Sequence, residues 1–291
     1  MAAVLKTAGA QALVSSNLTR SAKPRRPDPD TVMEMPRRRR SPVVIPALVL
    51  TLVVLAGILG AQVLGRGTGC MFAGDTCLRV LFIGNSYTSV NDLPATLAAL
   101  VRSGGGAVET RMIAPGGAFL SDHAASPEVE AAIAGTPWTA VVLQEQSQVP
   151  AVPAARDAQM APAAASLVAA IRAGGARPYL LETWAHRDGW LGQGMDRAAM
   201  QAAINAAYWE VAARNAAIVV PAAEAWNQAL AAAPGVALWQ VDGSHPTVAG
   251  TYLAACVLYA TITGRSPEGL AETGGLPVAD ATMLRRLVSA P

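Results

Sequence analysis

Short apolar runs alternate with longer helix-like segments over most of this chain, and this alternation constrains the fold more than any other feature. The expected strands occupy residues 78–84, 108–113, 139–143, 178–182 and 217–220. The helix-like segments lie at 93–102, 156–173, 196–215 and 246–263, and Pro246 is expected as a first helical residue. Strands that alternate with helices form a parallel sheet with helices on both faces. We therefore expect one α/β domain over residues 78–291.

Polar residues directly after the apolar runs are the candidates for chemistry, because ligands bind at the carboxyl ends of the strands in open parallel sheets. The first run ends in the motif GNSYT at 84–88, which contains Ser86. The motif DGSHP at 242–246 precedes the last helix. Asp242 lies three residues before His245 and can hold its Nδ1–H, which leaves Nε2 free to accept a proton from a hydroxyl. Each motif alone is also compatible with a turn or a helix cap.

Together, GNS after the first strand and D-x-x-H-P before the last helix resemble the first and last sequence blocks of the SGNH/GDSL hydrolases. The order and spacing match over residues 78–265. The resemblance implies a flavodoxin-like, three-layer α/β/α sandwich with about five parallel strands. It also implies a serine esterase without a metal or cofactor, in which Ser86 is the nucleophile, His245 the base and Asp242 its orienting partner.

The resemblance further implies an oxyanion hole made of the Ser86 backbone N–H, a glycine after the second strand and an asparagine side chain after the third. Gly117, in the motif PGGA at 115–118, fits the glycine, since a residue without a side chain lets its N–H approach the substrate closely. The asparagine is missing, because residues 144–147 read QEQS. Gln146 aligns with it and also carries an amide donor, and Gln144 is the alternative.

Four further polar or aromatic residues follow the third and fourth strands. Trp184 and His186 are candidates for substrate binding, although a tryptophan here also suits the core. His186 is the weaker candidate for the base, because no aspartate stands three residues before it. Glu145 and Glu182 leave open a glycosidase with two facing carboxylates. His123 receives no role.

The 23 residues 42–64 carry no charge and follow four arginines at 37–40. A stretch of about 20 apolar helical residues crosses a bilayer, and the arginines mark its cytoplasmic side. We expect a disordered, basic cytoplasmic tail over 1–41, a transmembrane anchor helix over 42–64 and a linker over 65–77. The catalytic domain would then lie outside a bacterial-type cell membrane. A cleaved signal peptide is the alternative.

The chain has three cysteines and three histidines, which makes a dedicated metal site hard to build. Outside the cytoplasm a disulfide between Cys70 and Cys77 is permitted, and lipid attachment at Cys70 is the alternative. Cys256 lies in an apolar helical stretch and is expected as a core thiol. Residues 41–291 carry 13 Lys/Arg against 17 Asp/Glu, which argues against a nucleic-acid-binding domain.

The expected function is hydrolysis of carboxylic esters, specifically O-acetyl groups on carbohydrates, through an acyl-serine intermediate. One alternative keeps the same site and transfers the acyl group to surface glycans. The other is a non-catalytic glycan-binding domain, which the missing asparagine motivates. The expected partners are an acylated carbohydrate and, through residues 42–64, the membrane.

Overall fold

The structure is a computed structural model that describes Cys70 and residues 77–288, all within one compact unit. The predicted tail over 1–41 and the predicted anchor over 42–64 lie outside the described residues, as does most of the linker over 65–77. In the part of the chain that the structure does describe, no helix has both the length and the apolar character needed to span a membrane.

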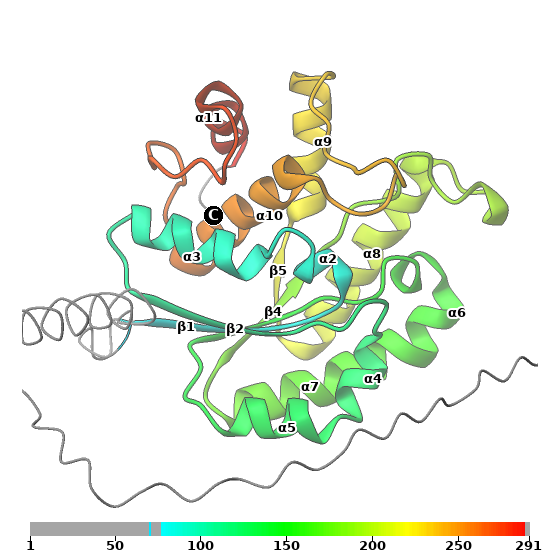
Figure 1. The fold of residues 1–291 in the computed structure, drawn as a ribbon. Helices are drawn as coiled ribbons and strands as arrows, with labels where there is room; N and C mark the ends of the chain where they lie inside the picture. Colours follow the sequence, from blue (N-terminus) through cyan, green and yellow to red (C-terminus); the bar gives the residue numbers. More distant parts are fainter. Residues whose placement is uncertain (1–69, 71–76, 289–291) are drawn as a thin grey trace, which may run out of the picture. The chain divides into compact units, whose positions relative to one another are not determined.

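The core of the domain is a sheet of five parallel strands in the order β2-β1-β3-β4-β5 (Figure 1). The strands are β1 (Leu78–Ile83), β2 (Val108–Ile113), β3 (Ala140–Leu143), β4 (Arg177–Leu181) and β5 (Ile218–Val220). The chain first runs from β1 to β2 at one edge and then returns to build the sheet on the other side of β1. The strand order therefore reverses at β1, and such a switch point forms a crevice at the carboxyl ends of the strands. The predicted five-stranded parallel α/β fold is confirmed.

Helices cover both faces of the sheet and make three layers (Figure 1). Alternate residues of β1 face opposite sides, so Val80 and Phe82 join one buried apolar cluster while Leu81 and Ile83 join another. The first cluster includes α3 (Leu93–Ser103), α9 (Ala222–Ala232), α10 (Val248–Thr263) and α11 (Val278–Arg286). The second includes α4 (Leu120–Ala124), α5 (Pro127–Ala134), α7 (Ala161–Ala173) and α8 (Arg197–Asn215).

Two predicted helices begin more than one residue away from the predicted start. Helix α10 begins at Val248 instead of Pro246, because Thr247 is its N-cap and accepts the Gly250 N–H at 3.2 Å. Residue 245 pairs with residue 240 through backbone atoms, which keeps the chain extended just before the cap. The helix expected over 156–173 starts with a π-helical turn, Arg156–Met160, ahead of α7. This turn precedes Pro162, which has no N–H for a regular helical bond.

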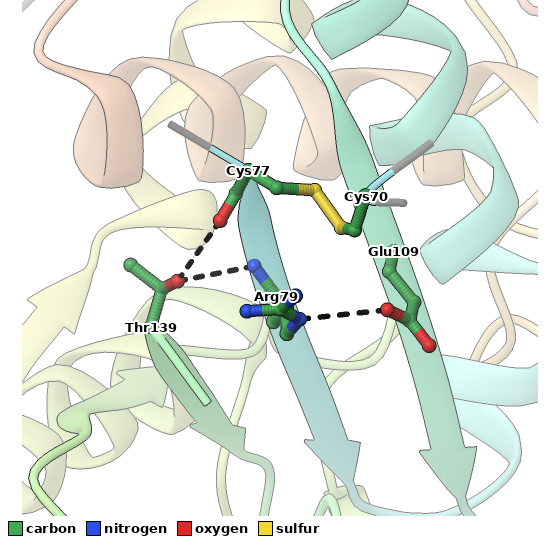
Figure 2. Close-up of a disulfide and its surroundings, with 5 residues drawn as sticks. All are labelled: Cys70, Cys77, Arg79, Glu109 and Thr139. Carbon is green, nitrogen blue, oxygen red and sulfur yellow. Dashed lines mark hydrogen bonds and ion pairs between the residues drawn. A yellow bond between two sulfur atoms is a disulfide. The ribbon is translucent and has the colours of Figure 1, made fainter. Parts of the chain in front are cut away.

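Cys70 and Cys77 form the predicted disulfide, with their Cα atoms 5.2 Å apart (Figure 2). It lies at the amino end of β1, the edge of the sheet opposite to the expected site. Thr139 joins this end of β1 to β3 by accepting the Arg79 backbone N–H at 3.1 Å. Cys256 is free and buried in α10, as predicted.

Candidate active site

The turn after β1 presents Ser86 at the carboxyl edge of the sheet. Asn85 is the N-cap of the short helix α2 (Ser86–Ser89), and its side chain accepts the Tyr87 N–H at 3.1 Å. Gly84 lets the side chains of Thr88 and Gln144 lie close to the backbone of the turn. A Cβ at this position would lie 2.6 Å from Thr88 Oγ1 and 2.7 Å from Gln144 Oε1. Any side chain at position 84 would therefore displace the turn that carries Ser86.

Gln144 holds this turn from the neighbouring strand β3. Its side-chain oxygen accepts the Asn85 N–H at 3.0 Å and the Thr88 hydroxyl at 2.9 Å, and its amide donates to Asn85 Oδ1 at 3.0 Å. Below the turn, His123 Nε2 donates to the Gly84 carbonyl at 2.7 Å. Gln144 and His123 are both buried, so they fix the turn without reaching the surface. No local sequence pattern predicts the His123 contact, because it joins residues 39 positions apart.

The loop between α9 and α10 brings Asp242 and His245 to Ser86. His245 Nε2 lies 2.9 Å from Ser86 Oγ, and His245 Nδ1 lies 2.5 Å from Asp242 Oδ2. The other oxygen of Asp242 accepts the backbone N–H groups of Ser244 and His245 at 2.9 and 3.0 Å. The Ser244 N–H is the main cause that lowers the pKa of Asp242, and the hydrogen bonds from His245 add to it. An ionised Asp242 accepts the Nδ1 proton and leaves Nε2 as the acceptor for the Ser86 hydroxyl proton.

Aromatic rings support this loop from beneath. Tyr87 stacks on Trp184 with ring centroids 5.0 Å apart and meets the His245 ring edge-on at 5.5 Å. The Tyr87 hydroxyl bonds to Ser244 Oγ at 2.6 Å, and Trp184 Nε1 donates to the Ser244 carbonyl at 3.0 Å. Trp184 is only 2% exposed, which leaves no surface for a substrate. The proposed substrate contact of Trp184 is thus replaced by a role in holding Ser244.

Ser86 and His245 line a surface pocket of about 450 Å³. It is lined by Asn85, Ser86, Tyr87, Gly116, Gly117, Gln146, Ser147, Gln148, His186, Ser244 and His245. These residues come from the segments after β1, β2, β3 and β4 and from the loop between α9 and α10, as expected for a site at a strand-order switch. Of the residues that the structure describes, no Leu, Ile, Val, Met or Phe lines this pocket.

Of the predicted oxyanion donors, Ser86, Gly117 and Gln146 all line this pocket. Gly117 has a φ of +75°, a conformation that favours glycine. Gln146 turns its side-chain oxygen toward the backbone N–H groups of Gln148 and Val149, at 2.8 and 3.3 Å. Gln144 does not line the pocket, since its amide is engaged below the Ser86 turn. The structure thus brings Gln146, and not Gln144, to the site.

Comparison with solved structures decides the family. A protein from Slackia heliotrinireducens, assigned to the SGNH hydrolases, is 34% identical in sequence and superposes with a TM-score of 0.55. The match covers 63% of this chain and 97% of that protein. The chain belongs to the SGNH hydrolases. This confirms the predicted family and enzyme class, a serine esterase of the SGNH/GDSL type.

Other matches share the fold at lower identity. A DUF4886 family protein from Bacteroides uniformis has a TM-score of 0.61 at 20% identity, covering 72% of this chain and 93% of its own. The acetyl xylan esterase AlAXEase has a TM-score of 0.52 at 13% identity, covering 63% and 98%. Neither a protein-family model nor a curated protein sequence matches this SGNH hydrolase.

His186 lines the pocket of this SGNH hydrolase without joining the Ser86 hydrogen-bond chain. Its Nε2 lies 3.2 Å from Ser147 Oγ, a second pocket residue. Burial lowers the pKa of His186, and nearby Asp242 opposes this shift. His186 and Ser147 therefore form a neutral, polar wall of the pocket that suits contacts to a substrate.

The two carboxylates that motivated a glycosidase do not line the pocket. Glu145 and Glu182 are 0% and 1% exposed. A glycosidase needs both carboxylates at the scissile bond, so this pair does not provide that chemistry in this SGNH hydrolase. Among residues 77–288, no group of three or more His, Cys, Asp or Glu side chains is arranged to hold a metal ion.

Proposed function

We propose that this SGNH hydrolase removes short acyl groups, specifically O-acetyl groups of carbohydrates, through an acyl-Ser86 intermediate. The hydrogen-bond chain from Ser86 through His245 to Asp242 carries the proposal. Its donors and acceptors are in the order that serine hydrolases use, in which a carboxylate orients the histidine and the histidine accepts the serine proton.

In the acylation step, Ser86 Oγ attacks the ester carbonyl carbon while its proton moves to His245 Nε2. The tetrahedral intermediate collapses, the bond to the alcohol oxygen breaks, and His245 returns the proton to that oxygen. In the deacylation step, His245 accepts a proton from water and the hydroxide attacks the carbonyl carbon of acyl-Ser86. The bond to Ser86 Oγ then breaks, and His245 returns the proton to Ser86 Oγ. The products are the free alcohol and the carboxylic acid, so no further reactant is required.

The developing oxyanion would be bound by the Ser86 and Gly117 N–H groups and by the Gln146 amide. Within residues 77–288, neither backbone N–H donates to another protein atom, so both are free for a ligand. The Gln146 oxygen is held by two backbone N–H groups. This leaves its nitrogen as the donor group of the amide, which serves in place of the family asparagine.

The pocket lining supports a small acyl group and a polar alcohol. A long acyl chain requires apolar side chains to cover it, because each buried CH₂ contributes roughly 0.8 kcal/mol. Among the described residues, the lining of this pocket contains no Leu, Ile, Val, Met or Phe; Tyr87 is its aromatic member, beside Ser, Gln and His side chains. Hydroxyl-rich sugars are the alcohols that such polar groups bind best.

The test is a chain-length series of p-nitrophenyl esters with the purified full-length chain in detergent. We expect the acetate to be hydrolysed with the highest kcat/KM and the octanoate at least about 10-fold more slowly, since the pocket does not stabilise the longer chain. Acetylated xylo-oligosaccharides should release acetate. An added sugar acceptor that captures the acetyl group in place of water would favour the acyltransferase alternative.

Ser86→Ala should abolish turnover, and Ser89→Ala, in the same short helix, should leave it near normal. A preference for octanoate would contradict the proposed substrate class. Near-normal activity of Ser86→Ala would contradict the mechanism.

We also propose that residues 42–64 anchor the enzyme in the cell membrane with the catalytic domain outside the cytoplasm. The disulfide between Cys70 and Cys77 supports an oxidising compartment. In spheroplasts of an expressing bacterium, added protease should degrade the domain. A domain that is protected until the cells are lysed would contradict this orientation.

A further inference from the structure

Glu145 is a buried carboxylate that the proposed mechanism does not use. It stands between Gln144, which holds the Ser86 turn, and Gln146, which lines the pocket, and it is 0% exposed. Burial raises the pKa of Glu145, against the effect of two backbone N–H groups that hydrogen-bond to it. A carboxyl group in such a place costs stability relative to an apolar residue, so its contacts require an explanation.

One oxygen of Glu145 joins two loops of the site. Oε1 accepts the Gln146 N–H at 2.7 Å and the Leu120 N–H at 3.0 Å. Leu120 begins α4, three residues after Gly117 in the loop that follows β2. Gln146 belongs to the loop that follows β3. The two loops that carry Gly117 and Gln146, the oxyanion donors outside the Ser86 turn, are thus joined through a single atom.

The backbone of Glu145 is itself held in place. Its N–H donates to the Tyr208 hydroxyl at 3.2 Å, and its carbonyl accepts the Gln144 amide. The second carboxyl oxygen, Oε2, is buried and has no hydrogen-bond partner within the described residues. One carboxyl oxygen is therefore held by hydrogen bonds, and the other is buried without one. A buried oxygen without a hydrogen bond destabilises the fold, so stability does not explain this side chain.

We propose that Glu145 is a positioning residue that sets the distance between Gly117 and the Gln146 amide in the oxyanion hole. The inference rests on the proposed function of these two donors. Oxyanion donors act only when they lie close to the position that the charge will occupy, and small displacements are costly. The contacts require one acceptor oxygen and no negative charge, so an amide at position 145 should replace the carboxyl group.

The first test is hydrogen–deuterium exchange of the full-length chain, which does not depend on turnover. In Glu145→Ala, peptides that contain Leu120 and Gln146 should exchange at least about 10-fold faster, because both N–H groups lose their acceptor. Glu145→Gln should keep the protection of the wild type. Unchanged protection in Glu145→Ala would overturn the inference, whether or not the chain hydrolyses esters.

The second test is a double-variant cycle on acetyl-ester turnover. Glu145→Ala should lower kcat at least about 10-fold with KM within about twofold, and Glu145→Gln should recover most of the loss. In a Gln146→Ala background, Glu145→Ala should reduce kcat far less, since one of the two donors that it positions is already gone. Fully additive losses would overturn the inference. Inactivity of the wild type with altered exchange in Glu145→Ala would instead contradict the proposed function.

Glu182→Ala is the matched control. Glu182 is also a buried glutamate directly after a strand, and it does not line the pocket. The Glu182→Ala variant should have a lower melting temperature and an unchanged kcat. An equal loss of kcat in Glu182→Ala would show that any buried glutamate near the sheet edge has this effect, and the positioning role of Glu145 would then be rejected.

Discussion

At the scale of residues, the two glutamines after β3 differ in role although they stand two positions apart. The sequence predicted that one of them replaces the family asparagine and left the choice open between them. Strand periodicity ends at Leu143, so it does not determine where loop side chains point. Tertiary contacts decide it: Gln144 is bound to Asn85 and Thr88 below the turn, and Gln146 lines the pocket. The residue types of the site were predictable from the motifs, but this orientation was not.

Gln146→Ala should lower kcat by roughly 10²-fold and change KM little, because the amide donates mainly to the transition state. Gln146→Glu tests the side-chain N–H donor separately from the hydrogen bonds that hold the loop in place. It keeps an oxygen for the Gln148 and Val149 N–H groups and removes the N–H donor, so it should lose as much activity as the alanine variant. Steady-state kinetics on an acetyl ester measure both. A Gln146→Glu variant with normal kcat would show that the amide is not an oxyanion donor.

At the scale of elements, local patterns predicted the strands well and the contacts between distant loops poorly. All five strands agree with the predicted ranges to within one residue. The central strands β1, β3 and β4 are mostly apolar because both faces of the sheet are covered, whereas the edge strand β2 reads VETRMI. Helices α4, α5, α9 and α11 were not predicted, although the Ser126 cap followed by Pro127 signals the start of α5. The bond between Tyr87 and Ser244 joins residues 157 positions apart, and no local pattern contains it.

Tyr87→Phe should lower kcat by about 3- to 10-fold and reduce the free energy of unfolding by about 1 kcal/mol. The ring keeps its stacking on Trp184, while the Ser244 hydroxyl next to His245 loses its partner. Tyr259→Phe is a matched control, because the Tyr259 hydroxyl is buried without a hydrogen-bond partner in the described part of the chain. That variant should be as stable as the wild type or more stable. Turnover and urea unfolding test both; identical kinetics of Tyr87→Phe and wild type would exclude a role for this bond.

At the scale of the whole molecule, the sequence predicted a parallel sheet between helical layers but not the strand order. Alternation of elements indicates parallel pairing and does not determine which strands are neighbours. The order that the structure shows places β1 and its Ser86 turn next to both β2 and β3. The anchor over 42–64 and the tail over 1–41 stay predictions. No sequence pattern predicted that Glu145 and Glu182 are buried. Their burial makes the stability of the domain depend on pH.

The pH dependence of stability should change in Glu182→Gln. Burial, with a smaller contribution from Glu224, raises the pKa of Glu182 from its usual 4.5 to about 7. Between these values the folded state holds a proton that the unfolded state has released, so the free energy of unfolding falls as the pH rises. Glu182→Gln has no titrating carboxyl group at this position, so its free energy of unfolding should fall less as the pH rises. Melting temperatures from pH 4.5 to 7.5 measure it, and parallel curves for variant and wild type would contradict the assignment.

The most direct test of the central claim, that Ser86 is the nucleophile, is the site of covalent labelling by a fluorophosphonate. The full-length chain is reacted with the reagent, digested and analysed by mass spectrometry. We predict one adduct, on the peptide that contains Ser86, with labelling strongly slowed in His245→Ala because the serine proton then has no acceptor. An adduct on a different serine, or equal labelling of Ser86→Ala, would contradict the account.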